Sequence, residues 1–508
     1  MSETEAATIP RDSSLDISSA RLEEFADLAT RLVTDYFTQI TEVPIFPQGS
    51  VQALVSNLGC EVPLEGEPIE QLFADCLKIL AGNRHNGHPR FFGYIASPAT
   101  PAGAFADLIA STLNANVTAW RSAPAATEIE RLVTRWLGSV IGYSDQAQGL
   151  LTSGGSMANL TALLIAHRTK SRDQSGHKGL WNSGPPMTIY ASEEIHLSIP
   201  KAADILGIGR DQIRGVPCDN EFRLNPQELR KAIQTDLRSG LRPFCVVANA
   251  GTVSTGAVDP LAEIAAIARE FQLWFHIDGA YGAPGTLDQS KRHLFAGLDL
   301  ADSVSLDAHK WLYVPIDAGC LLFHDAAAAQ RAFSSSAADY IKVHSDREGE
   351  EFAFWDYGIE LSRRFRALKI WMTLRYYGVR RIADAIAGDN KLAAYLGERI
   401  EAAKYFELLA PVTLSICCFR YVPETFSAKL VNASEQERIE TEAQLDLLNT
   451  EIMRGVQRGG EAYISNATIH GKFALRMCIT NFRTTQADID KTLQIIRAAA
   501  QQIIEANS

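Results

Sequence analysis

The sequence predicts an α/β protein in which a mostly parallel sheet is covered by helices and followed by a smaller α+β domain. From about residue 103 to 330, short apolar runs alternate with helical patterns. The runs are nearly continuous in apolar residues, as in strands buried on both faces. Two further strand-like stretches follow a long helical pattern beyond residue 360. Alternation of strand and helix is typical of a parallel sheet with helical crossovers.

The N-terminal region is predicted to be helical, with little core of its own. Residues 1–18 are polar, and residues 19–40 carry Leu and Phe at helical spacing until Pro44 and Pro47 end the pattern. Residues 67–81 show a second helical pattern. We therefore expect residues 1–102 to pack on another surface, such as a partner subunit.

Residues 103–382 are predicted to form the large domain. The expected strands are 187–192, 244–251, 273–281, 302–310 and 319–325. A helix is expected at 260–272, with Asp259 as its N-cap and Pro260 in its first turn.

The last third of the chain is predicted to hold a closing segment, a long helix and the small domain. Residues 335–358 are charged and then aromatic, which indicates an exposed segment able to close over a site. A helix over 360–378 is expected to end at Gly378. Residues 383–508 form the predicted small domain, with strands at 412–422 and 473–482.

Composition excludes several classes of function. The net charge of −12 leaves no basic stripe for nucleic acid or an anionic membrane. The N-terminus lacks the order of a signal peptide, and no run approaches the ~18 apolar residues of a membrane span. Eight scattered cysteines indicate reduced thiols in the cytoplasm. His85 and His88 are separated by the helix breaker Gly87, so no metal site is expected.

Three features at predicted strand ends carry the chemistry. Lys310 follows the strand in "SVSLDAHKW", Asp278 ends the strand in "FHIDGAYG", and Gly154 and Gly155 precede a helix in "LLTSGGSMAN". Taken singly, these features also fit a surface lysine, a helix cap and a tight turn. Together they supply a lysine for an imine, an acid for a pyridinium and a phosphate cradle. Pyridoxal 5'-phosphate (PLP) needs these three groups from a protein.

The chain resembles the group II PLP-dependent amino acid decarboxylases, the family of aromatic-L-amino-acid, tyrosine and glutamate decarboxylases. The resemblance extends from about residue 20 to 500. Its motifs are "HPRFFGY" (88–94), "WRSAPAATEIE" (120–130), "TSGGSMAN" (152–159), "HLSIPKAADILG" (196–207), "NAGTVSTGAVD" (249–259), "HIDGAYG" (276–282), "DAHKWL" (307–312) and "ELSRRFRALKIW" (360–371). It implies PLP-dependent transferase fold type I with a mostly parallel seven-stranded sheet. It also implies a homodimer with its active sites at the subunit interface.

The resemblance implies a role for each residue of a PLP site: covalent attachment, pairing with the ring nitrogen, contact with the ring and binding of the phosphate. Lys310 would attach the cofactor, and Asp278 would pair with the ring nitrogen. Ala280 and His196 would contact the two faces of the ring, and Thr252 would lie near the cofactor. The residues that would bind the phosphate are Gly154, Gly155, Ser156 and His309. The expected reaction is decarboxylation of an amino acid to the amine.

The product and the substrate remain open in the sequence. Counting back from "LSRRFR", the loop tyrosine that supplies a proton in the family falls on Phe354, with Tyr357 three residues on. Relatives with Phe at that position resemble aldehyde synthases, which release aldehyde, ammonia and peroxide. Plant relatives carry Ser at the position of Ser362 for phenolic side chains and Gly for indolic ones, so the resemblance favours tyrosine, DOPA or phenylalanine. Asn116 and Thr118 are candidates to line the pocket from the other subunit; they look more polar than their counterparts in the animal aromatic enzymes and keep glutamate and 2,4-diaminobutyrate open. Aminotransferases and a non-catalytic PLP-fold protein fit the motifs less well.

Overall fold

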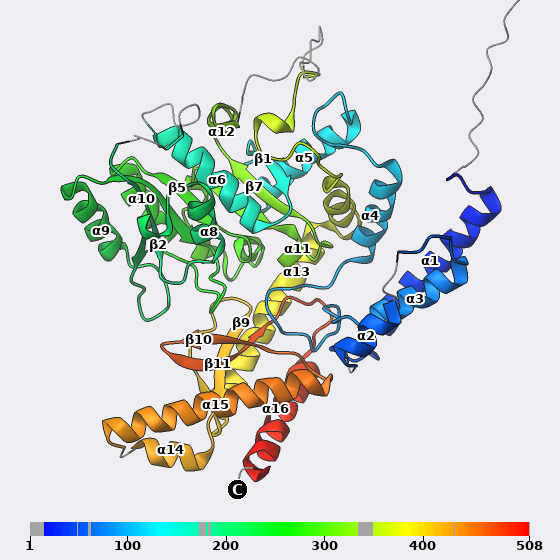
Figure 1. The fold of residues 1–508 in the computed structure, drawn as a ribbon. Coiled ribbons are helices and arrows are strands. Elements are labelled where there is room, and N and C mark those ends of the chain that lie inside the picture. Colours follow the sequence, from blue (N-terminus) through cyan, green and yellow to red (C-terminus); the bar gives the residue numbers. More distant parts are fainter. Residues whose placement is uncertain are drawn as a thin grey trace, which may run out of the picture. The chain divides into compact units, whose positions relative to one another are not determined.

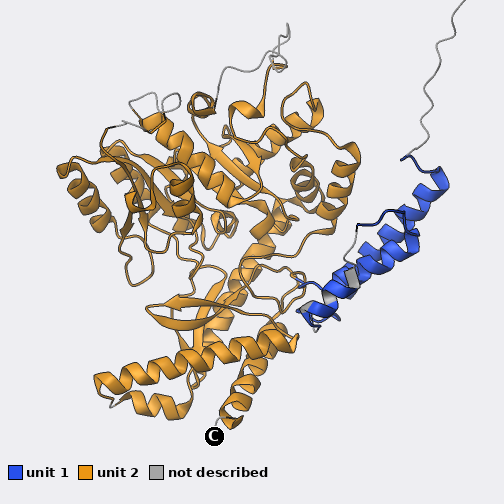
Figure 2. Ribbon diagram, in the orientation of Figure 1, with its two compact units in different colours: residues 1–85 blue, residues 86–508 orange. Residues whose placement is uncertain are grey.

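The computed structural model describes residues 15–47, 49–58, 62–171, 179–180, 184–333, 349–431 and 433–506. The chain divides into two compact units, residues 1–85 and 86–508 (Figure 2). The predicted divisions after residues 102 and 382 stay predictions, and helix α13 (Ala367–Ala402) runs through the second of them. Among the described residues, no helix is long and apolar enough to cross a bilayer.

The first unit consists of the helices α1 (Ser19–Gln39), α2 (Val51–Leu58) and α3 (Ile69–Ala81). The two predicted helices are therefore confirmed to within two residues. The ring of Phe25 on α1 meets that of Phe73 on α3 edge-on, at 6.1 Å between centroids. None of the described residues of α1 is buried. This unit on its own leaves most of its apolar side chains in contact with solvent.

The second unit contains the predicted mostly parallel sheet, with seven strands among the described residues (Figure 1). The strands are β1 (Gln148–Thr152), β2 (Met187–Ser192), β3 (Ile213–Val216), β4 (Arg242–Asn249), β5 (Trp274–Asp278), β6 (Ser303–Asp307) and β7 (Gly319–Phe323). Their order is β1-β7-β6-β5-β4-β2-β3. Strand β7 is antiparallel to β1 and β6, and the other neighbours are parallel. Strands β2, β5, β6 and β7 are buried throughout, which explains their continuous apolar sequences.

Helices pack on this sheet and complete the large core. Helix α6 (Gly155–Lys170) contacts β1, β4, β5, β6 and β7. The other helices of this region, before the long helix α13, are α4 (Pro101–Leu113), α5 (Pro124–Val140), α8 (Ser198–Ile205), α9 (Pro226–Arg238), α10 (Leu261–Glu270), α11 (Ala308–Trp311) and α12 (Ala326–Phe333).

The expectation that Asp259 caps the helix after it is wrong. Pro260 occupies the N-cap position of α10, and its side chain makes no capping bond. The buried Asp259 carboxylate instead accepts hydrogen bonds from the backbone N–H groups of Leu224 and Asn249, both at 2.7 Å. Desolvation raises the pKa of Asp259 to about 6. The acid therefore ties the end of β4 to a neighbouring loop.

The long helix differs from its prediction at both ends. Helix α13 begins at Ala367 rather than residue 360, and the irregular segment before it contains an ion pair between Glu360 and Arg366. It continues to Ala402, past the expected end at Gly378. Gly378 has φ +73°, so the helix is interrupted there and then resumes. Gly378 therefore correctly predicted a break in the helix, but the helix does not end there.

The small sheet is antiparallel, with the order β10-β11-β9-β8. Its strands are β8 (Phe406–Leu408), β9 (Ile416–Tyr421), β10 (Ser465–Ile469) and β11 (Lys472–Cys478). Helices α14 (Glu424–Val431), α15 (Glu435–Gly459) and α16 (Gln486–Ala506) accompany it (Figure 1). Strands β9 and β11 confirm the two predicted stretches. A second apolar core lies here, separate from that of the large sheet.

Candidate active site

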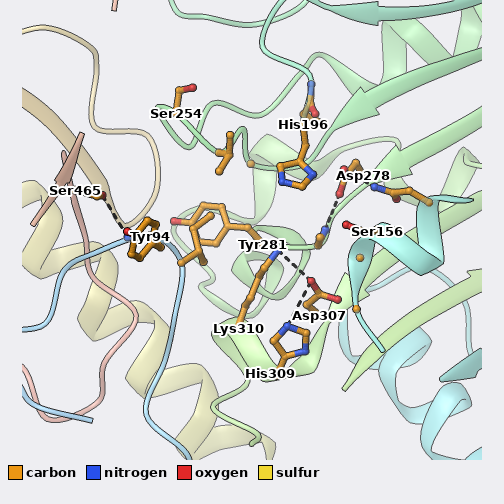
Figure 3. Close-up of a pocket in the computed structure, with 18 of the residues that line it drawn as sticks. Tyr94, Ser156, His196, Ser254, Asp278, Tyr281, Asp307, His309, Lys310 and Ser465 are labelled. Atoms are coloured by element: carbon orange, nitrogen blue, oxygen red, sulfur yellow. Dashed lines mark hydrogen bonds and ion pairs between the residues drawn. The ribbon is translucent and has the colours of Figure 1, made fainter. Parts of the chain in front are cut away.

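A cavity of about 580 Å³ lies where the strands of the large sheet end at their carboxyl termini. That volume lies in the range typical of small-molecule sites. Segments that follow β1, β2, β4, β5 and β6 line it, together with residues of β10 and β11 (Figure 3). The sequence-predicted residues among its lining are Gly154, Gly155, Ser156, His196, Asp278, Ala280, His309 and Lys310.

Lys310 stands on the short helix α11, directly after β6. Its Nζ lies 3.0 Å from Oδ2 of Asp307, and 21% of its side chain is exposed to the cavity. The next residue, Trp311, is fully buried and stacks on Tyr281 at 5.0 Å. Its Nε1 donates to Asp389 at 2.9 Å. The buried tryptophan therefore anchors the turn that presents the lysine.

Asp278 ends β5 and is held by a buried hydrogen-bond network. Its Oδ2 accepts from Asn159 Nδ2 at 2.7 Å, and its Oδ1 accepts from the Ala280 backbone at 3.1 Å. Asn159 Oδ1 faces His276 Nε2 at 3.0 Å. Burial lowers the pKa of His276 to about 4, so its ring is neutral. Asn159 therefore accepts from Nε2–H and keeps its amide donor directed at Asp278.

His196 faces the same cavity from the segment after β2 (Figure 3). Its Nδ1 accepts from the Ser198 backbone N–H at 3.2 Å and lies 2.9 Å from the Ser198 hydroxyl. Burial is the main cause that lowers the pKa of His196. A neutral ring whose Nδ1 is an acceptor carries its proton on Nε2. Asn159 Nδ2 also donates to Ser198 at 2.8 Å, so one amide supports both His196 and Asp278.

The glycine turn opens helix α6, whose first N–H groups have no acceptor within the helix. A Cβ added at Gly155 would lie 2.9 Å from the Ala280 Cβ and 3.1 Å from Asp307 Oδ2, so this position has no room for a side chain. His309 stands opposite, with Nδ1 accepting from the Ala318 N–H at 3.1 Å. Burial lowers the pKa of His309, so its Nε2, 3.7 Å from Asp307, makes no ion pair there.

These residues fit PLP. The free N–H groups at the start of α6 and the close backbone approach at Gly155 suit a phosphate. Asp278 is a buried acid with room for a cationic partner, and the methyl of Ala280 leaves space beside it for a flat ring. Lys310 and His196 face the space between them (Figure 3).

Three predicted site residues do not line the cavity themselves, although Thr252 stands between two residues that do, Gly251 and Val253. The Thr252 hydroxyl bonds to Thr255 at 2.9 Å and accepts from Ala257 N–H at 3.1 Å, inside its own loop. Phe354, only 1% exposed, lies under the Arg363 guanidinium at 4.1 Å. The Tyr357 hydroxyl accepts from Gln330 at 2.9 Å. None of the three is among the cavity's lining residues. Residues 335–348 of the predicted closing segment lie outside the described residues.

The residues expected to choose the substrate also lie outside this cavity in the single chain. Ser362 is exposed. Asn116 accepts from the Arg363 backbone at 2.8 Å. Thr118 is buried, and its carbonyl accepts from Phe354 N–H at 2.9 Å. The role of Asn116 and Thr118 in lining the pocket from a second subunit stays a prediction, as does the influence of Ser362 on the substrate.

The structure adds Asn159, Asp307 and Arg476 to the site. Arg476, on β11, is 3% exposed and donates through Nη1 to the Tyr94 carbonyl at 2.8 Å. Its Nη2 is buried and has no hydrogen-bond partner among the described residues. The signal was present in "FALRMCITNF", where an arginine interrupts an apolar strand. Buried cations without full pairing are costly, so such a residue indicates an anionic ligand.

Comparisons with known proteins agree with this geometry. Residues 52–422 match the family described as the pyridoxal-dependent decarboxylase conserved domain. An aromatic-L-amino-acid decarboxylase of Bacillus atrophaeus is 33% identical over 96% of this chain and 97% of that protein. A 4-hydroxyphenylacetaldehyde synthase of Rhodiola rosea is 32% identical over 97% and 99%. The crystal structure of Oryza sativa TDC with PLP and tryptamine superimposes with a TM-score of 0.87 at 26% identity, over 97% of this chain and 100% of that one.

Proposed function

The chain belongs to the pyridoxal-dependent decarboxylase family, and we propose that it converts an aromatic L-amino acid to the corresponding amine and CO2. Tyrosine, DOPA and phenylalanine are the proposed substrates. The observation that carries the proposal is the convergence of Lys310, Asp278 and the Gly154–Ser156 turn on one cavity. The similarity to the Bacillus aromatic-L-amino-acid decarboxylase supports the choice of substrate class.

Each residue has a physical task in this reaction. PLP supplies an electron sink for the bond that breaks at Cα. Lys310 provides the amine that holds the cofactor, and the Asp278 carboxylate stabilises a positive charge on the pyridine nitrogen. The neutral His196 offers a flat ring face and an Nε2–H donor towards the cavity. Arg476 offers Nη2 to the substrate carboxylate, which would satisfy its unpaired donor.

The cavity also supports a substrate with an apolar side chain. Tyr94, Ile95 and Val253 are among its lining residues, and 52% of Tyr94 is exposed. Such a lining stabilises an aromatic ring by burial and by contact between rings. Glutamate or 2,4-diaminobutyrate would need a charged partner for the side chain. Arg476 is the arginine in the described lining, and its proposed role is to bind the α-carboxylate.

Formation of an aldehyde is not proposed, because its argument rested on Phe354. A side chain that is 1% exposed beneath Arg363 has no access to a cofactor in its own cavity. The backbone N–H of Phe354 is also bonded to Thr118. The site therefore offers no residue-specific reason to prefer peroxide chemistry over simple protonation.

We further propose a cytoplasmic homodimer. Helix α4 exposes Phe105, Leu108, Ile109 and Leu113, and burying such side chains against a second copy would be favourable. The seven cysteines in the described part of the chain are free thiols, which suits a reducing compartment. Light scattering of the holoenzyme tests the dimer, and a monomeric mass at micromolar concentration would contradict it.

A product assay in air tests the proposed activity. The holoenzyme is offered tyrosine, DOPA, phenylalanine, tryptophan, glutamate and 2,4-diaminobutyrate, and amine, aldehyde and peroxide are measured together. Amine from the first three substrates without peroxide is the expected result. Aldehyde with stoichiometric peroxide would replace the proposal with the oxidative reaction. Amine from glutamate or 2,4-diaminobutyrate alone would overturn the aromatic assignment.

A further inference from the structure

Asp307 is a buried acid placed beside the cofactor's phosphate position. It ends β6 and is 2% exposed. Its Oδ2 lies so close to Gly155 that a Cβ added there would be 3.1 Å away. Gly155 belongs to the turn that fits the phosphate of PLP. The acid and the phosphate therefore share one wall of the cavity.

The two carboxylate oxygens have different surroundings. Oδ2 pairs with Lys310 Nζ at 3.0 Å. Oδ1 is buried and has no hydrogen-bond partner among the described residues. The neighbouring His309 is neutral and lies beyond hydrogen-bond distance, at 3.7 Å from Oδ2. Lys310 is therefore the cation that balances Asp307.

PLP brings a second negative group to this wall and uses the same lysine. A phosphate ester carries a charge of about −1.5 to −2 near neutral pH. Lys310 is the cation that pairs with Asp307 at this wall, and it is also the residue that would hold the cofactor, so the acid and the phosphate would have to share one positive charge. An ionised carboxylate is an acceptor only and offers no hydrogen to a phosphate oxygen. Like charges in a buried site disfavour one another strongly.

We infer that Asp307 lowers the affinity of the site for the phosphate group of its cofactor, so that the enzyme holds PLP less tightly than the same site with an amide would. Asparagine has the same shape and replaces one carboxylate oxygen with a donor. The inference rests on the use of PLP and not on the choice of amino acid substrate, so it survives or fails separately from the proposed function.

The test compares pyridoxamine 5'-phosphate with pyridoxamine. The two probes differ only in the phosphate, and neither has the aldehyde that consumes Lys310. Cofactor-free protein, prepared from holoenzyme, is titrated with each probe by calorimetry. Asp307→Asn should bind pyridoxamine 5'-phosphate at least about tenfold more tightly than the wild type, and pyridoxamine with little change. Loss of PLP from the reconstituted variant during dialysis should be slower in proportion.

Two further variants make the result decisive. Asp307→Ala removes the charge without adding a donor, so it should gain affinity for the phosphorylated probe to a smaller extent. Asp288→Asn, a buried acid bonded to Asn390 at 2.8 Å and outside the cavity lining, should leave both affinities unchanged. Unchanged or weaker binding of pyridoxamine 5'-phosphate by the folded Asp307→Asn protein would overturn the inference. Equal gains for both probes would also overturn it, because the effect would then not come from the phosphate.

Discussion

The neutral His276 behind Asp278 should make the stability of the protein depend on pH in a specific direction. His276 lies in a buried row of donors and acceptors. Trp274 Nε1 donates to Ser303 Oγ at 2.9 Å, and Ser303 Oγ lies 2.9 Å from His276 Nδ1. With Nε2–H donating to Asn159, Nδ1 of the neutral ring is the acceptor that faces the Ser303 hydroxyl. Protonation of Nδ1 would place a charge in a buried site, and this burial is the main cause of the lowered pKa of His276.

The magnitude follows from the depressed pKa. In the unfolded chain a histidine takes up a proton below about 6.5, whereas folded His276 does so only near about 4. The stability that this histidine supports is therefore complete above pH 6.5 and is lost as the pH falls towards 4. The difference of about 2.5 in pKa corresponds to about 3 kcal/mol of unfolding free energy.

Two buried acids act in the opposite direction over the same range. Burial raises the pKa of Asp259 to about 6 and that of Asp389 to about 7. An acid with a raised pKa favours the folded state at low pH and loses that contribution as the pH rises through the raised value. The pH dependence of the whole protein therefore mixes opposing effects. The difference between the wild type and His276→Gln isolates the histidine.

The assay is urea unfolding of the wild type and of His276→Gln, each saturated with PLP, at intervals from pH 7.5 to 4.5. The variant should be less stable at pH 7.5, because Asn159 and Ser303 lose their bonded partner. Its deficit should shrink by about 2–3 kcal/mol towards pH 4.5. A deficit that is constant across this range would refute the assignment of a buried neutral His276.

Three other substitutions have definite expected outcomes. Lys310→Ala should abolish decarboxylation and the visible absorbance of bound PLP, and an unchanged spectrum would contradict covalent attachment there. Arg476→Ala should lower kcat/KM by about 10- to 100-fold, the value of one hydrogen bond to a charged group, while the absorbance of bound PLP stays the same. Loss of that absorbance would instead mean that Arg476 holds the cofactor. Phe354→Tyr should leave the ratio of amine to aldehyde unchanged, because Phe354 is buried under Arg363, whereas a shift in that ratio would restore Phe354 to the site.

The cofactor site was largely predictable because its residues stand at fixed offsets from strand ends. The carboxyl ends of parallel strands meet at one edge of a sheet, so Asp278 and Lys310 converge without further information. The glycine turn before α6 follows the same rule. The shape of the sheet was likewise predictable from its apolar strands. The short β3, "IRGV", gave no sequence signal, because it is only partly buried and carries a charge.

Residues whose position depends on distant packing could not be placed in this way. Phe354 was assigned by counting along a loop, but its ring is fixed by Arg363, which forms a buried ion pair with Glu130 on α5. The guanidinium, with 1% of the Arg363 side chain exposed, pairs with the Glu130 carboxylate and lies over the Phe354 ring, and both contacts stabilise a buried positive charge. Distance along the chain carries no information about such a cluster.

Lys310 stands between a histidine and a tryptophan, and its position depends both on this local sequence and on contacts with residues far along the chain. The histidine accepts from Ala318 N–H and the tryptophan donates to Asp389, so hydrogen bonds fix both neighbours of the lysine, while His309 and Lys310 line the cavity. Asp389 also accepts from Tyr313 at 2.7 Å, which makes it the common anchor of the residues after Lys310. A buried carboxylate with two donors on one oxygen is strongly oriented. The three-residue motif therefore specifies which atom reacts, and an acid 79 residues away specifies where that atom stands.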